Sequence, residues 1–128
     1  MAPIEVGGPG LIVVVRPRGE LDFAEDENLR GALDLAISRT SELVVVDCSG
    51  VEFIDSTALG SFVRAGKRLQ QNGCRLQLVH VPATMERVIK IVKLWEFFDA
   101  SGPNDDLELH VDLALAWTED AELRVTFG

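Results

Sequence analysis

Three aspartates and two adjacent hydroxyls are the residues whose types and spacing suggest chemistry in this sequence. Asp22 comes after the second apolar run, Asp47 ends the third, and Asp55 stands directly before Ser56 and Thr57, where a helical pattern starts. In open α/β sheets, functional sites tend to lie beyond the carboxyl ends of parallel strands. We therefore expect the three acids to gather at this end of a sheet.

A hydroxyl at the start of a helix can serve the fold or serve chemistry. As an N-cap, the oxygen of Ser56 would accept a free backbone N–H, a bond that stabilises a helix by about 1 kcal/mol. As a modification site, Ser56 would present a nucleophile where a phosphate meets unpaired N–H groups and the positive end of the helix dipole. Spacing alone favours the capping role.

The apolar segments alternate between strand-like and helix-like spacing, in the order β-β-α-β-α-β-α. A glycine-rich turn between the first two runs predicts a hairpin. This order predicts an α/β fold with a mixed, mainly parallel sheet of four to five strands and packed helices. The expected strands are Pro3–Val6, Leu11–Arg16, Leu43–Asp47 and Leu76–Val81, and the expected helices run from Glu25 through Ile37, from Ser56 to Asn72 and from Pro82 through Trp95.

Two patterns overlap in the chain after Gly102. Leu107–Leu115 and Leu123–Phe127 alternate as in a hairpin, whereas Asp112 followed by Leu113, Ala116, Trp117 and Ala121 forms a helical stripe. We expect a short strand at Leu107–His110 and then a terminal helix.

Composition narrows the function classes. The 128 residues include 12 basic and 21 acidic side chains, a formal charge of −9. Nucleic acids and anionic membranes attract the opposite charge, so we expect neither as a partner. The apolar runs are too short to span a bilayer, and Met1–Gly10 lacks the pattern of a signal peptide. We expect one cytoplasmic domain over residues 1–128.

Cysteines and histidines are few and far apart. Cys48 and Cys74 are expected to be buried structural thiols, and His80 and His110 lack the companions that a zinc site needs. The sequence also lacks a nucleophile elbow, a Cys–His pairing and a phosphate-binding glycine loop. We expect no metal, no cofactor and no enzymatic activity.

The residues around Ser56 closely resemble the central motif of the STAS domain, the fold of bacterial anti-sigma factor antagonists and of the cytoplasmic tails of sulfate transporters. The match runs over Val44–Gly60, with the core Asp-Ser-Thr-Ala-Leu-Gly, and Gly19–Asp22 matches the family's second signature, Gly-Glu-Leu-Asp. Leu76–Pro82 and a terminal helix over Asp112–Asp120 extend the resemblance to nearly the whole chain.

The resemblance implies a phosphorylation switch. Ser56 occupies the position that the anti-sigma factor, a serine kinase, phosphorylates in antagonists of this family, and a serine phosphatase is the implied counterpart. Unphosphorylated protein would hold the anti-sigma factor and free the sigma factor for transcription, whereas phosphorylated protein would release it. We expect a monomer. The implied partner-binding residues are Asp22, Asp55, Ser56, Thr57, Leu59 and Gly60.

The chain departs from the family pattern at Ala58, where many relatives have glycine, and at Cys48, where many have leucine. Neither change removes the acceptor.

Other interpretations remain open at this stage. A phosphorelay receiver would also place acids such as Asp22, Asp47 and Asp55 beside a sheet, although the opening hairpin argues against it. The main alternative is a STAS module that is not phosphorylated and that senses a ligand or serves as a scaffold in a signalling assembly.

Overall fold

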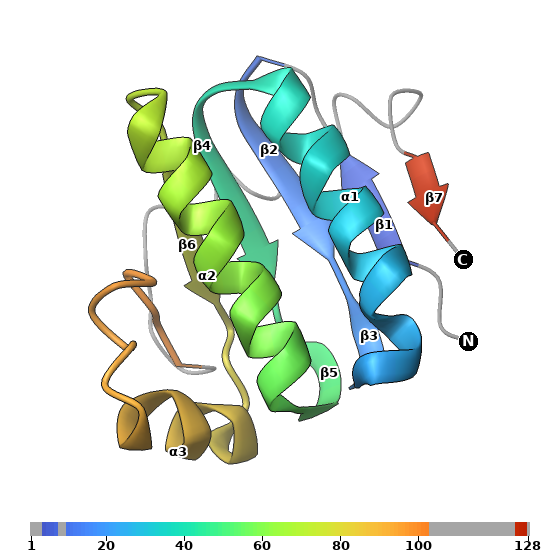
Figure 1. Ribbon diagram of the computed structural model, residues 1–128, viewed down its shortest axis with the longest axis vertical. Coiled ribbons are helices and arrows are strands. Elements are labelled where there is room, and N and C mark those ends of the chain that lie inside the picture. The colour runs from blue at the N-terminus through green and yellow to red at the C-terminus, as the bar shows by residue number, and fades with distance from the viewer. Residues whose placement is uncertain (1–3, 8–9, 103–124, 128) are drawn as a thin grey trace.

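A five-stranded sheet forms the centre of the computed structural model, which describes residues 4–7, 10–102 and 125–127. The strand order is β6-β4-β2-β1-β7 (Figure 1). β2 pairs in parallel with β4, and β4 with β6, whereas β1 is antiparallel to both β2 and β7. The expected hairpin and mixed sheet are confirmed. The strands are β1 (Ile4–Gly7), β2 (Gly10–Arg16), β4 (Thr40–Asp47), β6 (Arg75–Val79) and β7 (Val125–Phe127).

Two helices, α1 (Asp26–Arg39) and α2 (Ser56–Gln71), lie side by side on one face of the sheet (Figure 1). α2 ends as its sequence predicts. Gly73 adopts a left-handed φ of 75°, and its N–H donates to the carbonyl of Gln70. This is the geometry in which glycine closes a helix at low steric cost.

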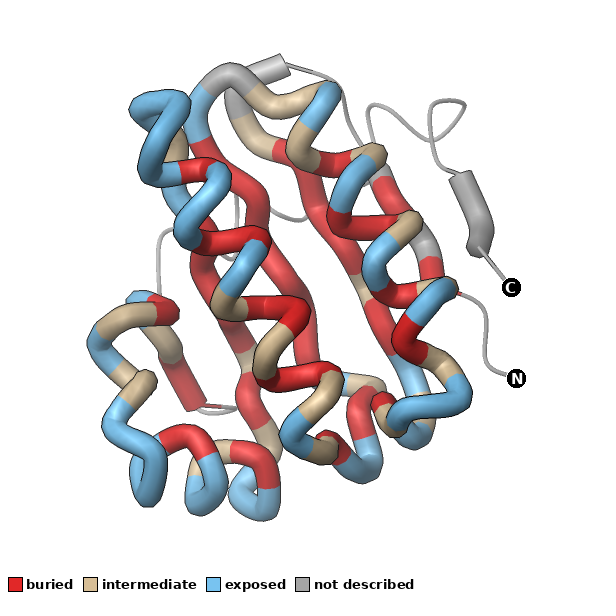
Figure 2. Tube along the Cα trace, viewed as in Figure 1, coloured by how far each residue is buried: buried red, intermediate tan, exposed pale blue. Residues whose placement is uncertain are grey.

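The main core lies between the sheet and these helices. Figure 2 shows that the strands behind the helices are mostly buried. Alternate residues of β2, β4 and β6 face the helices, and the residues between them form a smaller cluster on the opposite face. Every residue from Leu43 to Asp47 is buried, which confirms a strand covered on both faces. Phe62 and Leu69 of α2 and Leu29 of α1 are large side chains of the main core, each 1% exposed or less.

The sequence analysis did not predict two short strands. β3 (Arg18–Leu21) and β5 (Gly50–Ile54) pair in parallel as a separate two-stranded ribbon, just beyond the ends of β2 and β4. Gly19 supplies a left-handed φ of 76° at a register shift in this ribbon, and a Cβ on Gly50 would lie 2.8 Å from Cγ of Arg18. The ribbon therefore depends on glycine at both positions.

The third helix is shorter than expected. α3 (Ala83–Ile91) begins after Pro82, as predicted, but stops before Trp95. Lys93 adopts a left-handed φ of 61°, and the N–H of Leu94 donates to the carbonyl of Ile89. This arrangement closes a helix, and a lysine at the closing position gives no sequence signal for it.

The expected strand at Leu107–His110 and the expected terminal helix over Asp112–Asp120 lie outside the described residues. β7 is a strand that the preferred interpretation of the tail omitted and the hairpin alternative included. Within the described ranges, no helix is long and apolar enough to cross a membrane.

Candidate functional site

The ribbon of β3 and β5 brings Asp22 and Asp55 together. Leu21 pairs with Ile54 in the parallel register, and the N–H of Asp55 donates to the carbonyl of Leu21 at 3.1 Å. Each aspartate follows its strand directly, so the two acids occupy neighbouring positions at the end of the ribbon. The expected juxtaposition of Asp22 and Asp55 is confirmed.

Asp55 uses both carboxylate oxygens to organise this end. Its Oδ1 accepts the backbone N–H of Ala58 at 3.0 Å and so caps α2. Its Oδ2 accepts the backbone N–H of Phe23 at 3.0 Å, which ties the turn after β3 to the start of α2. Asp22 caps the short 3₁₀ helix Phe23–Glu25 in the same way, accepting the N–H of Glu25 at 3.2 Å. Both acids are half-buried.

Ser56 is the first residue of α2, and its side chain is exposed. The capping role that spacing favoured for Ser56 is wrong, because Asp55 performs it. By contrast, Ser61 lies in the middle of α2, is 3% exposed and donates to Asp26 Oδ1 at 2.6 Å. Ser56 is therefore exposed to solvent, and the Ser61 hydroxyl is committed to the fold.

The remaining predicted site residues differ in accessibility. Thr57 is half-buried, whereas Leu59 is 8% exposed and packs in the main core. Leu59 therefore supports the helix from below instead of offering a contact surface.

Gly60 lies four residues after Ser56, on the same side of α2. A Cβ there would lie 3.7 Å from Nη1 of Arg64, an ordinary van der Waals distance. The fold has room for a side chain at this position.

The structure separates Asp47 from the other two acids, so the expectation of a single three-acid cluster is wrong. Asp47 ends β4, before the ribbon, and its side chain is only 10% exposed. Its Oδ1 lies 3.0 Å from Nδ1 of His80, and its Oδ2 lies 3.3 Å from Nε of Arg16. The missed element is β5, whose Val, Phe and Ile residues are a strand signal that the sequence analysis did not use.

A hollow of about 500 Å³ opens beside this buried acid. It is lined by Asp47, Ser49, His80, Pro82 and Ala83. The described residues contain no group of three or more His, Cys, Asp or Glu that can hold a metal ion.

The two cysteines differ in burial. Burial, together with the charge of Asp47, raises the pKa of the Cys48 thiol far above its usual range. Cys48 is thus an inert buried thiol, as expected, whereas Cys74 is only half-buried.

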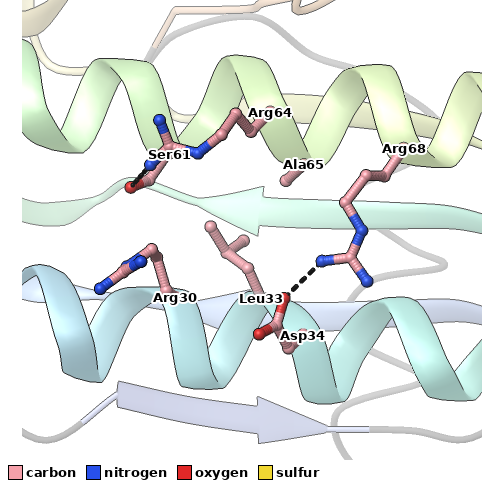
Figure 3. Close-up of a pocket in the computed structure, with 7 residues that line it drawn as sticks. All are labelled: Arg30, Leu33, Asp34, Ser61, Arg64, Ala65 and Arg68. Atoms are coloured by element: carbon pink, nitrogen blue, oxygen red, sulfur yellow. Dashed lines mark hydrogen bonds and ion pairs between the residues drawn. The ribbon is translucent and has the colours of Figure 1, made fainter.

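A second hollow, of about 190 Å³, lies between α1 and α2 and contains three arginines (Figure 3). Arg68 of α2 reaches across to Asp34 of α1, and Arg30 pairs with Asp26 at 3.0 Å. Arg64 donates to the Oγ of Ser61 at 3.0 Å. The Arg68–Asp34 pair joins the two helices, as does the bond from Ser61 to Asp26, whereas the other two contacts lie within one helix.

Comparisons with known proteins agree with this geometry. The sequence model of the STAS domain matches residues 3–114. An anti-sigma F factor antagonist from Paenibacillus polymyxa is 28% identical over 86 residues, which cover 66% of this chain and 74% of that protein.

Solved structures share the fold at lower identity. An anti-sigma factor antagonist from Mycobacterium paratuberculosis superposes with a TM-score of 0.70 at 22% identity, covering 90% of this chain and 94% of that one. The antagonist SpoIIAA in its unphosphorylated form gives 0.65 at 22% identity, covering 81% and 88%. A structure of Bacillus SpoIIAA in its phosphorylated form also matches, with a TM-score of 0.60 at 23% identity, covering 80% and 90%.

Proposed function

The chain belongs to the STAS domain family, and from this premise we propose that it is an anti-sigma factor antagonist controlled by phosphorylation of Ser56. Unphosphorylated, it binds an anti-sigma factor that is a serine kinase and so frees a sigma factor for transcription. Phosphorylated, it releases that kinase. The similarity to named antagonists supports the general role.

One observation carries the proposal: Ser56 is exposed at the start of α2 while Asp55 performs the capping. A serine that serves only its own helix accepts the N–H of a residue two or three positions ahead. Here Ala58, two positions after Ser56, donates to Asp55 instead. Ser56 therefore has a position suited to modification and no capping task.

Electrostatics supports release without unfolding. A phosphate on Ser56 adds a charge of roughly −1.5 to −2 at pH 7. The N-terminus of α2 stabilises that charge, because its backbone N–H groups and dipole favour anions. Asp22 and Asp55 oppose it from the neighbouring turns. The new charge and bulk therefore act mainly on the docked partner, at its nucleotide-bearing face.

The proposed partner surface follows the ribbon end and the first turns of α2. Asp22 and Asp55 set the shape of the turns beside Ser56, and Thr57 flanks the acceptor. Gly60 leaves room for close approach of the partner, and Leu59 anchors the turn to the core.

We further propose that residues 1–128 act as one STAS domain, monomeric and in the cytoplasm, without catalytic activity of their own. A serine phosphatase would restore the binding form. The net charge of −9 disfavours direct contact with nucleic acid or anionic membrane.

The test is phosphate transfer. Incubation with ATP and the purified cognate anti-sigma factor should add one phosphate to the intact mass of the wild-type chain and none to Ser56→Ala. Ser61→Ala is the matched control, because its hydroxyl is buried, and it should still accept one phosphate. Phosphate on Ser56→Ala would contradict the assignment of the acceptor.

One observation favours the alternative, a STAS module that senses a ligand or acts as a scaffold without phosphorylation. The hollow beside Asp47 and His80 is large enough for a small molecule. This alternative predicts that the wild-type chain binds its partner, gains no phosphate, and changes its affinity when Asp47→Asn alters the hollow.

A further inference from the structure

Large apolar side chains are exposed in only two parts of the described chain. Three belong to α3 and the residue that follows it, and the other two are Phe23 and Phe53, beside the acceptor serine. Phe23 is 78% exposed and Phe53 is 52% exposed. A phenylalanine exposed to water gives up the free energy that burial of its side chain would supply, so two of them in neighbouring segments call for an explanation.

Their positions relative to Ser56 are fixed by the backbone. Phe53 lies in β5, three residues before Ser56, and pairs with Glu20 of β3 on the outer side of the ribbon. The next pair, Leu21 and Ile54, is buried, so the ribbon places its apolar core on one side and Phe53 on the other.

Phe23 is held from the opposite strand. Its backbone N–H donates to Asp55 Oδ2, the same carboxylate whose other oxygen caps α2. A single aspartate thus fixes the backbone of Phe23 and the start of the helix that begins with Ser56. Both phenylalanines lie in segments that are hydrogen-bonded to the residues around Ser56.

The two segments that carry the rings are acidic. Residues 18–25 and 50–59 include five carboxylates, and the one guanidinium among them, Arg18, starts β3 at the far end of the ribbon from Ser56. The carboxylates are Glu20, Asp22, Glu25, Glu52 and Asp55. An aromatic pair within an acidic rim is complementary to an apolar surface bordered by lysine or arginine.

We propose that Phe23 and Phe53 are the apolar anchors of the docking surface, inserting into an apolar patch with a basic rim on the anti-sigma factor kinase. This inference rests on the proposed function and names the contacts that supply affinity at the same site. Buried aromatic residues surrounded by polar contacts carry most of the energy of many interfaces. The two rings supply affinity for the kinase. The phosphorylation state of Ser56, which lies beside their segments, decides whether the kinase stays bound.

The test measures binding of the purified kinase, with ADP bound, by titration calorimetry. The variants are Phe23→Ser, the double variant Phe23→Ser/Phe53→Ser, and Ile91→Ser as a control that removes an equally exposed apolar side chain from α3 (72% exposed). Unfolding midpoints close to wild type establish that each variant is folded. If the double variant does not fold, the single variant Phe23→Ser is used for the test.

We expect the double variant to bind at least about 30-fold more weakly, Phe23→Ser at least about fivefold, and Ile91→Ser within about threefold of wild type. The double variant should still accept one phosphate on Ser56 at high kinase concentration, since its hydroxyl is intact.

If the double variant, or Phe23→Ser when only that variant folds, binds the kinase as tightly as wild type, the anchor role of the two rings is refuted. The proposed phosphorylation switch is not affected by this result. An equal loss with Ile91→Ser would refute the anchor role as well, because it would indicate general apolar adhesion. A wild-type chain that binds no kinase would instead overturn the proposed function, and the anchors with it.

Discussion

The two halves of α2 each contain a glycine, and the two glycines have different surroundings. A Cβ on Gly66 would lie 3.0 Å from Cε2 of Phe97, which packs against the core. A Cβ on Gly60 would meet only an ordinary contact with Arg64. Glycine inside a helix costs roughly 0.5–1 kcal/mol relative to alanine. The fold explains this cost at Gly66 but not at Gly60.

The glycine in the second half of α2 is therefore explained by packing within the protein, and the glycine in the first half is not. The second half is closed by Gly73 and packed under Phe97. The first half begins with an exposed serine and includes a glycine with room around it. The proposed docking of the anti-sigma factor along this face would account for both features.

The largest expected effect on stability is that of replacing Gly66. Gly66→Val forces two methyl groups against Phe97 and should lower the free energy of unfolding by about 1–3 kcal/mol. Gly60→Val, the matched change on the open side, should stay within about 0.5 kcal/mol of wild type. Urea unfolding of the two variants measures both values. Equal losses would remove the distinction between the two halves.

Removal of the Asp55 carboxylate should have the next largest effect. Asp55→Ala loses the cap of α2 and the bond to the N–H of Phe23, so stability should fall by about 1–2 kcal/mol. Asp22→Ala, which loses the cap of a three-residue 3₁₀ helix, is the control and should cost less. Thermal unfolding followed by circular dichroism distinguishes them. A larger loss for Asp22→Ala would contradict the role assigned to Asp55.

A small effect on stability, opposite in sign to the losses above, is expected for Gly60→Ala. This variant should be more stable by roughly 0.5–1 kcal/mol, because alanine favours the helix and the added methyl group has room. The same variant should bind the anti-sigma factor more weakly, since the methyl group stands where the partner approaches. A variant that is both more stable and equally tight in binding would show that Gly60 has no role in docking.

Long, strongly patterned segments were predictable from the sequence. The buried strand Leu43–Asp47 and the stripe of Leu59, Phe62 and Leu69 on α2 follow directly from hydrophobic spacing, and both are confirmed. The end of α2 was predictable because Asn72-Gly73 has the residue type that the left-handed closing position favours. The end of α3 was not, because Lys93 takes that conformation without being glycine.

The candidate site was predictable only in part. The neighbouring positions of Asp22 and Asp55 were expected, but the ribbon that creates them was not. β3 has four residues and β5 has five, too few for a clear period. Because the ribbon was not predicted, Asp47 was expected beside Asp22 and Asp55. Its actual partners, Arg16 and His80, are far from it in sequence, so no local pattern indicates them. Exposure of Phe53 inside an apolar run also needs the tertiary structure to be seen.

Affinity for the anti-sigma factor, measured with unphosphorylated chain and with chain fully phosphorylated on Ser56, tests the central claim most directly. We predict that phosphorylation weakens binding by more than about 100-fold, equivalent to about 3 kcal/mol, with the fold unchanged by circular dichroism. Equal affinity of the two forms would contradict the account, because the exposed hydroxyl at the start of α2 would then control nothing.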